Sequence, residues 1–227
     1  MGTDDLFKRR KEKREIRKSR GIELRKASWL IVCEGKETEV NYFECLLDYV
    51  NSKSSKKIKR NIKGLGMNTD TLVKSVEDLL SETENYIKDS IIPYEKIFVV
   101  FDKDSFSNSD FNEAINRSER LGYIPLWSNE CFELWYILHF EYFTSSSGRE
   151  LYFNKLSKLF EKKYSKTDNH FNLLGGVSNI STAYKNASKL YKEFSNEKFR
   201  SYSKMKPCTT VFMILDEIEN TIGVKLK

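Results

Sequence analysis

Three apolar segments of this sequence end in acidic side chains. The first ends at Glu34, the second at the pair Asp102 and Asp104, and the third is followed by Glu130. Buried strands more often end in turn-forming residues such as glycine, asparagine or serine. Carboxylates crowded at the mouth of an apolar core repel one another, and their pKa values rise. A divalent cation removes this conflict, and hard oxygen ligands of this kind favour Mg²⁺ or Mn²⁺.

We therefore predict a site for one or two Mg²⁺ or Mn²⁺ ions, bound by Glu34, Asp102 and Asp104. An Asp-x-Asp pair alone has an ordinary explanation, because aspartates commonly cap helices and form turns after strands. A Glu34–Gly35 dipeptide at the end of another buried strand makes the pattern more specific. Such ions lower the pKa of bound water and so activate it, although Glu34 could instead act as the general base. The chain has only two histidines, so it offers few of the ligands that a zinc hydrolase site requires.

Other polar residues near these strand ends are candidates for further roles. Glu133, in the first turn of an expected helix, is predicted to be catalytic, either as a further metal ligand or by holding a ligand in place. His139 lies six residues later on a different helical line, and a core position beside Trp135 is the favoured interpretation. Lys206 could neutralise charge in a transition state, or could be a solvated lysine. The supporting candidates are Lys36, Ser128, Asn129, His139 and Lys206.

Two glycine-containing stretches do not fit nucleotide-binding motifs. A P-loop would need a glycine five residues before Gly35, but Leu30 stands there. The stretch around Gly64 and Gly66 has Thr69 in place of the third glycine of the dinucleotide fingerprint. The glutamates of the first stretch would also repel phosphates unless a metal intervened.

The elements that must hold the candidate residues alternate between strand and helix patterns. We expect strands at residues 28–34, 56–64, 94–102 and 123–129. We expect helices at residues 38–50, 69–90, 110–122 and 131–143, followed by helical segments only, at 149–163, 180–199 and 209–220. Thr38 is placed to cap the first helix, and Glu39 suits its dipole. The alternation predicts an α/β fold with a mainly parallel sheet flanked by helices.

Excess positive charge is confined to a basic N-terminal arm, residues 1–27. Residues 1–26 contain eleven lysines and arginines against five acids, a balance of +6 that equals that of the whole chain. Such an arm could bind the phosphate backbone of a nucleic acid, or could be a solvated tail. The residues expected to make nucleic-acid contacts are Lys8, Arg9, Arg10, Lys11 and Arg14.

The rest of the chain divides into an α/β domain at residues 28–144 and a helical extension at residues 145–227 packed on it. The extension could cover the sheet edge or form a homodimer face. Four cysteines without paired spacing indicate free thiols in a reducing cytoplasm. No apolar run approaches the roughly 18 residues that a membrane helix requires. We therefore expect a soluble cytoplasmic protein.

The sequence resembles the RloB family over nearly its whole length from about residue 27. The resemblance is carried by IVCEGKETEVNYF, VVFDKDSFS, SNECFELWYILHFE and KPCTTVFMILDEI, of which CFELWYILHFE is the most specific part. Glu-Gly after one strand and Asp-x-Asp after another also resemble the TOPRIM fold of topoisomerases, primases and OLD-family nucleases. The family commonly has Asn-Pro where this chain has Asn129–Glu130, so we expect a different turn there and an extra carboxylate near the metals.

The resemblance implies a metal-dependent phosphodiesterase that acts in bacteriophage defence by abortive infection, often encoded beside an AAA-type ATPase. Its substrate would be DNA or RNA, with transfer RNA among the candidates. A non-catalytic alternative is a nucleic-acid-binding or adaptor module that works with the partner ATPase. A cleavage assay with and without Mn²⁺ separates these two functions.

Overall fold

The computed structural model describes residues 27–66, 76–103, 106–146, 148–176, 178–195 and 201–227. Residues 1–26 of the basic arm lie outside these ranges, and so does Asp104. The contacts predicted for the arm, at Lys8, Arg9, Arg10, Lys11 and Arg14, therefore stay predictions, as does the part assigned to Asp104.

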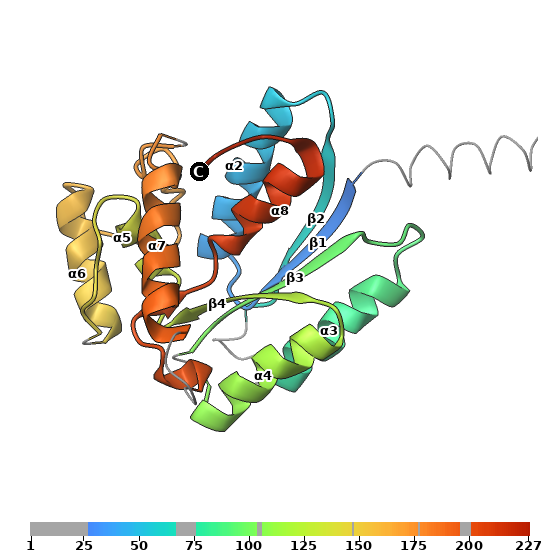
Figure 1. Ribbon diagram of the computed structural model, residues 1–227, viewed down its shortest axis with the longest axis horizontal. Coiled ribbons are helices and arrows are strands. Elements are labelled where there is room, and N and C mark those ends of the chain that lie inside the picture. Colours follow the sequence, from blue (N-terminus) through green and yellow to red (C-terminus); the bar gives the residue numbers. More distant parts are fainter. Residues whose placement is uncertain (1–26, 67–75, 104–105, 147, 177, 196–200) are drawn as a thin grey trace, which may run out of the picture.

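Within the described residues, a five-stranded sheet forms the centre of the molecule (Figure 1). Its strands are β1 (Ala27–Cys33), β2 (Ile58–Gly64), β3 (Lys96–Asp102), β4 (Ile124–Asn129) and β5 (Cys208–Thr209). They lie in the order β2-β1-β3-β4-β5, with the first four parallel and β5 antiparallel to β4. The predicted mainly parallel α/β fold is confirmed, and the carboxyl ends of β1 and β3 are neighbours.

Helices cover both faces of the sheet (Figure 1). One face carries α2 (Thr38–Lys53) and α8 (Met213–Ile222), and the other carries α3 (Val76–Lys88) and α4 (Asn108–Arg120). Beside the sheet, α5 (Glu133–Leu138) packs against α6 (Arg149–Leu159) and α7 (Ile180–Ser195). Among the described helices, none has the length and apolar character needed to cross a membrane.

The burial of β1 explains its uninterrupted apolar sequence. Trp29, Ile31 and Cys33 pack toward α2, whereas Leu30 and Val32 pack toward α3 and α4. Both faces are therefore covered, as is usual for a central parallel strand. In contrast, β2 is an edge strand with partly exposed charged residues, in agreement with its polar composition.

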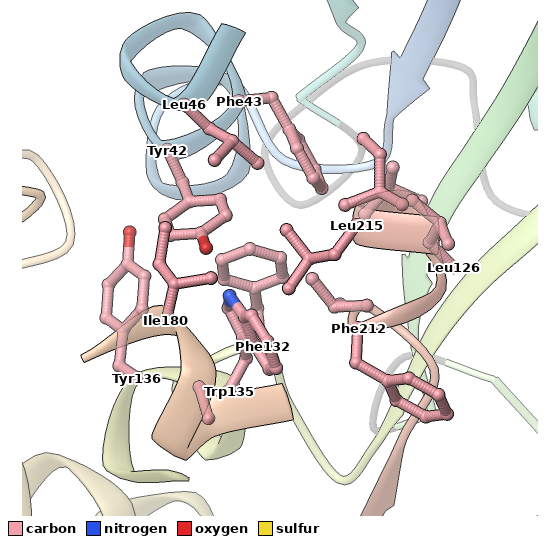
Figure 2. Packing of buried hydrophobic residues seen from close by; sticks show 14 of the residues in the cluster. Tyr42, Phe43, Leu46, Leu126, Phe132, Trp135, Tyr136, Ile180, Phe212 and Leu215 are labelled. Atoms are coloured by element: carbon pink, nitrogen blue, oxygen red, sulfur yellow. The ribbon is translucent and has the colours of Figure 1, made fainter. Parts of the chain in front are cut away.

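The helical extension packs on the α/β domain through one aromatic-rich cluster (Figure 2). Tyr42 of α2 contacts the rings of Phe132, Trp135 and Tyr136 at centroid distances of 5.8, 6.2 and 5.9 Å. From the extension, the cluster includes Ile180, Phe212 and Leu215. Because each large apolar side chain contributes about 1.5–3 kcal/mol when fully buried, this shared core fixes the extension against the sheet.

Three local predictions are wrong. The chain beyond residue 145 is not entirely helical, because β5 joins the sheet next to β4. Thr38 does not cap α2; its hydroxyl donates to the Lys166 carbonyl at 3.1 Å, and Glu37 is the N-cap residue. Finally, the helix expected at residues 131–143 is shorter, since α5 ends at Leu138, whose carbonyl oxygen accepts a hydrogen bond from the Asn186 amide at 2.9 Å.

Candidate functional site

Glu34 and Asp102 meet at the carboxyl ends of the adjacent strands β1 and β3. The register pairs Cys33 with Val100, and Glu34 N continues this pairing by donating to Val100 O at 2.9 Å. The Glu34 side chain turns toward β3, where its Oε2 accepts a hydrogen bond from Asp102 N at 3.0 Å. Only 3% of Glu34 and 7% of Asp102 is exposed. Two acids far apart in the sequence therefore share one buried end of the sheet.

A third carboxylate, that of Glu39, reaches the same place from the first turn of α2. Its side chain lies against Gly35, where an added Cβ atom would be 2.3 Å from Glu39 Oε2. Gly64, at the end of β2, is packed as closely, since a Cβ atom there would be 2.7 Å from the Gly35 carbonyl oxygen. Glycine at these two positions lets the turn after β1 lie between α2 and β2.

These carboxylates line an open pocket of about 640 Å³, which we call the carboxylate pocket. Its described lining residues are Glu34, Gly35, Lys36, Glu37, Thr38, Glu39, Gly66, Asp102, Arg149 and Lys166. Lys36 follows β1, whereas Arg149 and Lys166 come from the helical extension. The pocket thus combines buried acids with three cationic side chains, an arrangement that suits an anionic ligand bound together with a metal ion.

Glu133 lies behind the carboxylate pocket and does not line it. Only 1% of this residue is exposed. Its Oε1 accepts a hydrogen bond from the Tyr164 hydroxyl at 2.9 Å, and Lys166 Nζ lies 3.8 Å from the same oxygen. The Tyr164 ring stacks on His170 with centroids 4.9 Å apart. The extension therefore holds the Glu133 carboxylate in place, which fits a supporting role better than direct contact with a ligand.

Burial and mutual repulsion raise the pKa values of the acids. The pKa of Glu39 rises to about 7, first because burial penalises the charged form and further because Glu133 and Glu34 are close. The pKa of Asp102 is raised in the same way, by burial first and then by the three glutamates. Burial and the neighbouring carboxylates thus disfavour the charged forms of Glu39 and Asp102.

The donor chemistry of the carboxylate pocket fits a hard divalent cation. Its acidic donors are all carboxylate oxygens, which Mg²⁺ and Mn²⁺ prefer, and a cation would relieve their repulsion. Within the described residues, no group of three or more His, Cys, Asp or Glu side chains is placed to hold a metal ion. Asp104, the second acid of the Asp-x-Asp pair, lies outside them. Because Mg²⁺ is commonly bound by one or two carboxylates plus water, Glu34 and Asp102 can supply its protein ligands.

Ser128 and Asn129, two of the supporting candidates, contact the C-terminal part of the chain. Ser128 Oγ and Thr209 Oγ1 are 2.9 Å apart, and Asn129 Nδ2 donates to the Ser203 carbonyl at 3.0 Å. Both side chains are buried, and neither lines the carboxylate pocket. The partners of these two side chains therefore belong to the short strand β5 and to the 3-10 helix Tyr202–Lys204.

Glu130 and Lys206 form an ion pair with each other. Neither residue lines the carboxylate pocket. The extra carboxylate after β4 is thus neutralised by the lysine that was a candidate for binding transition-state charge. The peptide bond between Asn129 and Glu130 is cis.

His139 occupies the core position that its sequence surroundings favoured. Its ring packs against Trp135 and Tyr42 with centroids 4.9 and 6.0 Å away, and Nδ1 lies 2.8 Å from the Trp135 carbonyl oxygen. Burial lowers the pKa of His139 to about 4, so the ring is neutral at physiological pH. This histidine does not line the carboxylate pocket.

Sequence reasoning did not assign site roles to Glu39, Arg149, Tyr164 or Lys166. A signal existed for Glu39, because side chains in the first turn of a helix tilt toward its N-terminus and hence toward the preceding strand end. The other three residues follow α5 in the chain, and no local pattern shows where they pack.

A model of the RloB-like protein family matches residues 29–218 of this chain. The matched range contains every described residue that lines the carboxylate pocket, together with Glu133 and Tyr164. No curated protein and no solved structure matches the chain significantly.

Proposed function

This chain belongs to the RloB-like family, and we propose that it is a divalent-metal-dependent nuclease acting as an effector in bacteriophage defence. It would hydrolyse phosphodiester bonds in DNA or RNA, with transfer RNA among the candidate substrates. The observation that carries the proposal is the meeting of Glu34 and Asp102, beside Glu39, in a pocket that also presents cationic side chains. Acids of this kind suit a metal ion, and the neighbouring cations suit a phosphodiester.

In this proposal Glu34 and Asp102 hold Mg²⁺ or Mn²⁺, with Asp104 as a further ligand. When bound, the ion polarises the scissile phosphate and lowers the pKa of an attacking water. The hydrogen bond from Asp102 N orients the Glu34 carboxylate before any ligand arrives. Glu39 supplies a further carboxylate to the pocket, where it is a candidate general base, and its packing on Gly35 fixes its position.

We assign the substrate phosphate to Arg149 and Lys166, both of which line the carboxylate pocket. A guanidinium group can bind two phosphate oxygens at once, and an ammonium group adds a compact positive charge. The hydrogen bond from the Thr38 hydroxyl to the Lys166 carbonyl ties this segment of the extension to the start of α2. The extension would therefore complete the site rather than merely cover the sheet.

The proposal is tested by incubating the full chain with plasmid, single-stranded DNA and total tRNA, with Mn²⁺ or with EDTA. We expect Mn²⁺-dependent cleavage of at least one substrate, lost in the Glu34→Gln, Asp102→Asn double variant and kept in Glu130→Gln. If the protein binds nucleic acid but cleaves none, even when co-expressed with a neighbouring AAA-type ATPase, the adaptor function replaces the nuclease. We place this activity in the cytoplasm, because all four cysteines are free thiols.

A further inference from the structure

A second concave surface lies along the edge strand β2, and we call it the β2 groove. Its volume is about 520 Å³. The side chains that define it are Lys59, Asn61 and Lys63 of β2, Tyr86 of α3, and Tyr94 just before β3. None of these residues lines the carboxylate pocket.

The groove exists because alternate residues of β2 point to opposite faces of the sheet. Ile58 and Ile62 pack with the cluster on the α2 face, and Arg60 there binds Glu44 and Asp48 of α2 at 2.6 and 2.7 Å. The other row, Lys59, Asn61 and Lys63, therefore faces the α3 side. There α3 packs on β3 and α4, which leaves this row of the edge strand beside an open groove.

The charge of the groove is positive and largely uncompensated. Lys59 and Lys63 form no ion pair with any described residue, whereas Arg60 on the opposite face has two acidic partners. Among the described lining residues, Asp89 is the single acid. The two lysines are about 13 Å apart along the strand at the usual rise per residue. Such a row can contact two phosphates of one nucleic-acid strand.

Aromatic rings accompany the lysines. Lys63 Nζ lies 5.4 Å from the centre of the Tyr86 ring, and the Asn61 amide donates to the Tyr94 hydroxyl at 2.7 Å. Proteins that bind single-stranded nucleic acid combine cations that follow the backbone with aromatic faces on which bases stack. The β2 groove has both features within one stretch of surface.

The carboxyl end of β2 lies close to the carboxylate pocket. Beyond β2 the chain continues to Gly66, whose backbone N–H donates to the Glu34 carbonyl at 2.9 Å and which lines that pocket. A chain of three residues spans at most about 11 Å, so Lys63 is within that distance of Gly66. At Gly66 the side chain of Lys36 lies directly against the backbone. Lysines thus lie both along the edge strand and at the carboxylate pocket.

We propose that the β2 groove binds the sugar–phosphate backbone of a single nucleic-acid strand and directs it to the carboxylate pocket. Lys59 and Lys63 contact phosphates, and Tyr86 offers a ring face to a base. This inference rests on the proposed function for the identity of the ligand as nucleic acid. It assigns to the edge strand a role in substrate binding that is separate from the hydrolytic chemistry.

The test measures binding of the full chain to a fluorescein-labelled oligo(dT) and a labelled oligo(U) by anisotropy, in EDTA so that no cleavage occurs. The Lys59→Gln, Lys63→Gln double variant removes two cations and keeps unbranched, polar side chains. Its matched control is Lys185→Gln, Lys192→Gln, two exposed lysines on one helix, α7. Circular dichroism establishes that both variants fold.

We expect the β2 double variant to bind about tenfold more weakly than the control, and its plot of log K against log salt to be shallower by about 1.4. Equal affinity and equal salt slope in the two double variants would overturn the inference. A wild type that binds neither oligonucleotide would overturn it as well. The nuclease proposal fails separately, if Glu34→Gln, Asp102→Asn cleaves as wild type does in Mn²⁺.

Discussion

Glu34 and Asp102, at the ends of β1 and β3, line the carboxylate pocket together with Glu39, whereas Glu130, after β4, forms an ion pair with Lys206 outside it. In the first region burial and repulsion raise the pKa values of the acids; in the second an ion pair balances the charge. Acids whose charged forms are disfavoured by burial and by one another lower the stability of a fold, and such groups are typical of functional sites. An acid at a strand end is therefore informative only once its partner is known.

The largest expected effect is on cleavage. Asp102→Asn should lower the Mn²⁺-dependent rate by about 100-fold or more, because it removes a proposed metal ligand. Glu130→Gln should leave the rate nearly unchanged, because Glu130 binds Lys206 outside the pocket. Single-turnover assays on the most susceptible substrate measure both rates. Equal losses of cleavage rate in the two variants would show that the carboxylate pocket is no more important for cleavage than the Glu130–Lys206 pair.

The next effect is on the pH dependence of stability without metal. The pKa of Glu39 is about 7 in the folded protein against an ordinary value of 4.5. Between these values the folded state keeps a proton that the unfolded chain releases, so the free energy of unfolding falls as pH rises. From pH 5 to pH 8 the wild type should lose about 2 to 3 kcal/mol more than Glu39→Gln, as measured by urea unfolding in EDTA.

His139 changes the free energy of unfolding in the opposite direction as pH rises. Its pKa is lowered to about 4, so its buried neutral ring destabilises the fold as pH falls from 6.5 toward 4. Because wild type and Glu39→Gln share this contribution, only the difference between their curves reports on Glu39. Parallel curves would show that folding does not raise the pKa of Glu39.

A smaller effect is expected from the hydrogen bond that holds Glu133. Tyr164→Phe removes the donor to a buried carboxylate oxygen and should lower the free energy of unfolding by about 1–3 kcal/mol. The matched control is Tyr142→Phe, which removes a hydrogen bond to the exposed Glu193 and should cost no more than about 0.5 kcal/mol. Chemical denaturation at pH 7.5 compares them. Similar losses of unfolding free energy in the two variants would show that the Tyr164 hydrogen bond does not stabilise the buried Glu133 carboxylate.

The smallest effect concerns the Glu130–Lys206 pair. Its side chains are 19% and 35% exposed, so solvent screens their attraction. Lys206→Gln should lower the free energy of unfolding by about 0.2–1 kcal/mol, with cleavage unchanged. If Lys206→Gln cleaves more slowly than Glu130→Gln, Lys206 takes part in cleavage.

Much of the fold was predictable because its signals are local. The continuous apolar run of β1 and that of β3 indicated central parallel strands, and parallel strands present their carboxyl ends at one edge. Glu34 and Asp102 could therefore be placed together before their geometry was known. Glu39 could have been added by the direction of side chains in a first helical turn.

The rest depends on packing that leaves no local pattern. The two residues of β5 are too few for periodicity, yet they bring Thr209 against Ser128. Arg149, Tyr164 and Lys166 reach the site only because the extension packs on the aromatic cluster around Tyr42. Such long-range placement follows from the tertiary core, which sequence patterns do not specify.

The most direct test of the central claim is calorimetric titration of Mn²⁺ into metal-free protein at pH 7.5. Wild type and Glu130→Gln should bind Mn²⁺ with the same affinity, and the Glu34→Gln, Asp102→Asn double variant should show no saturable binding. Undiminished Mn²⁺ affinity in that double variant would contradict the account, because the ion would then be held elsewhere.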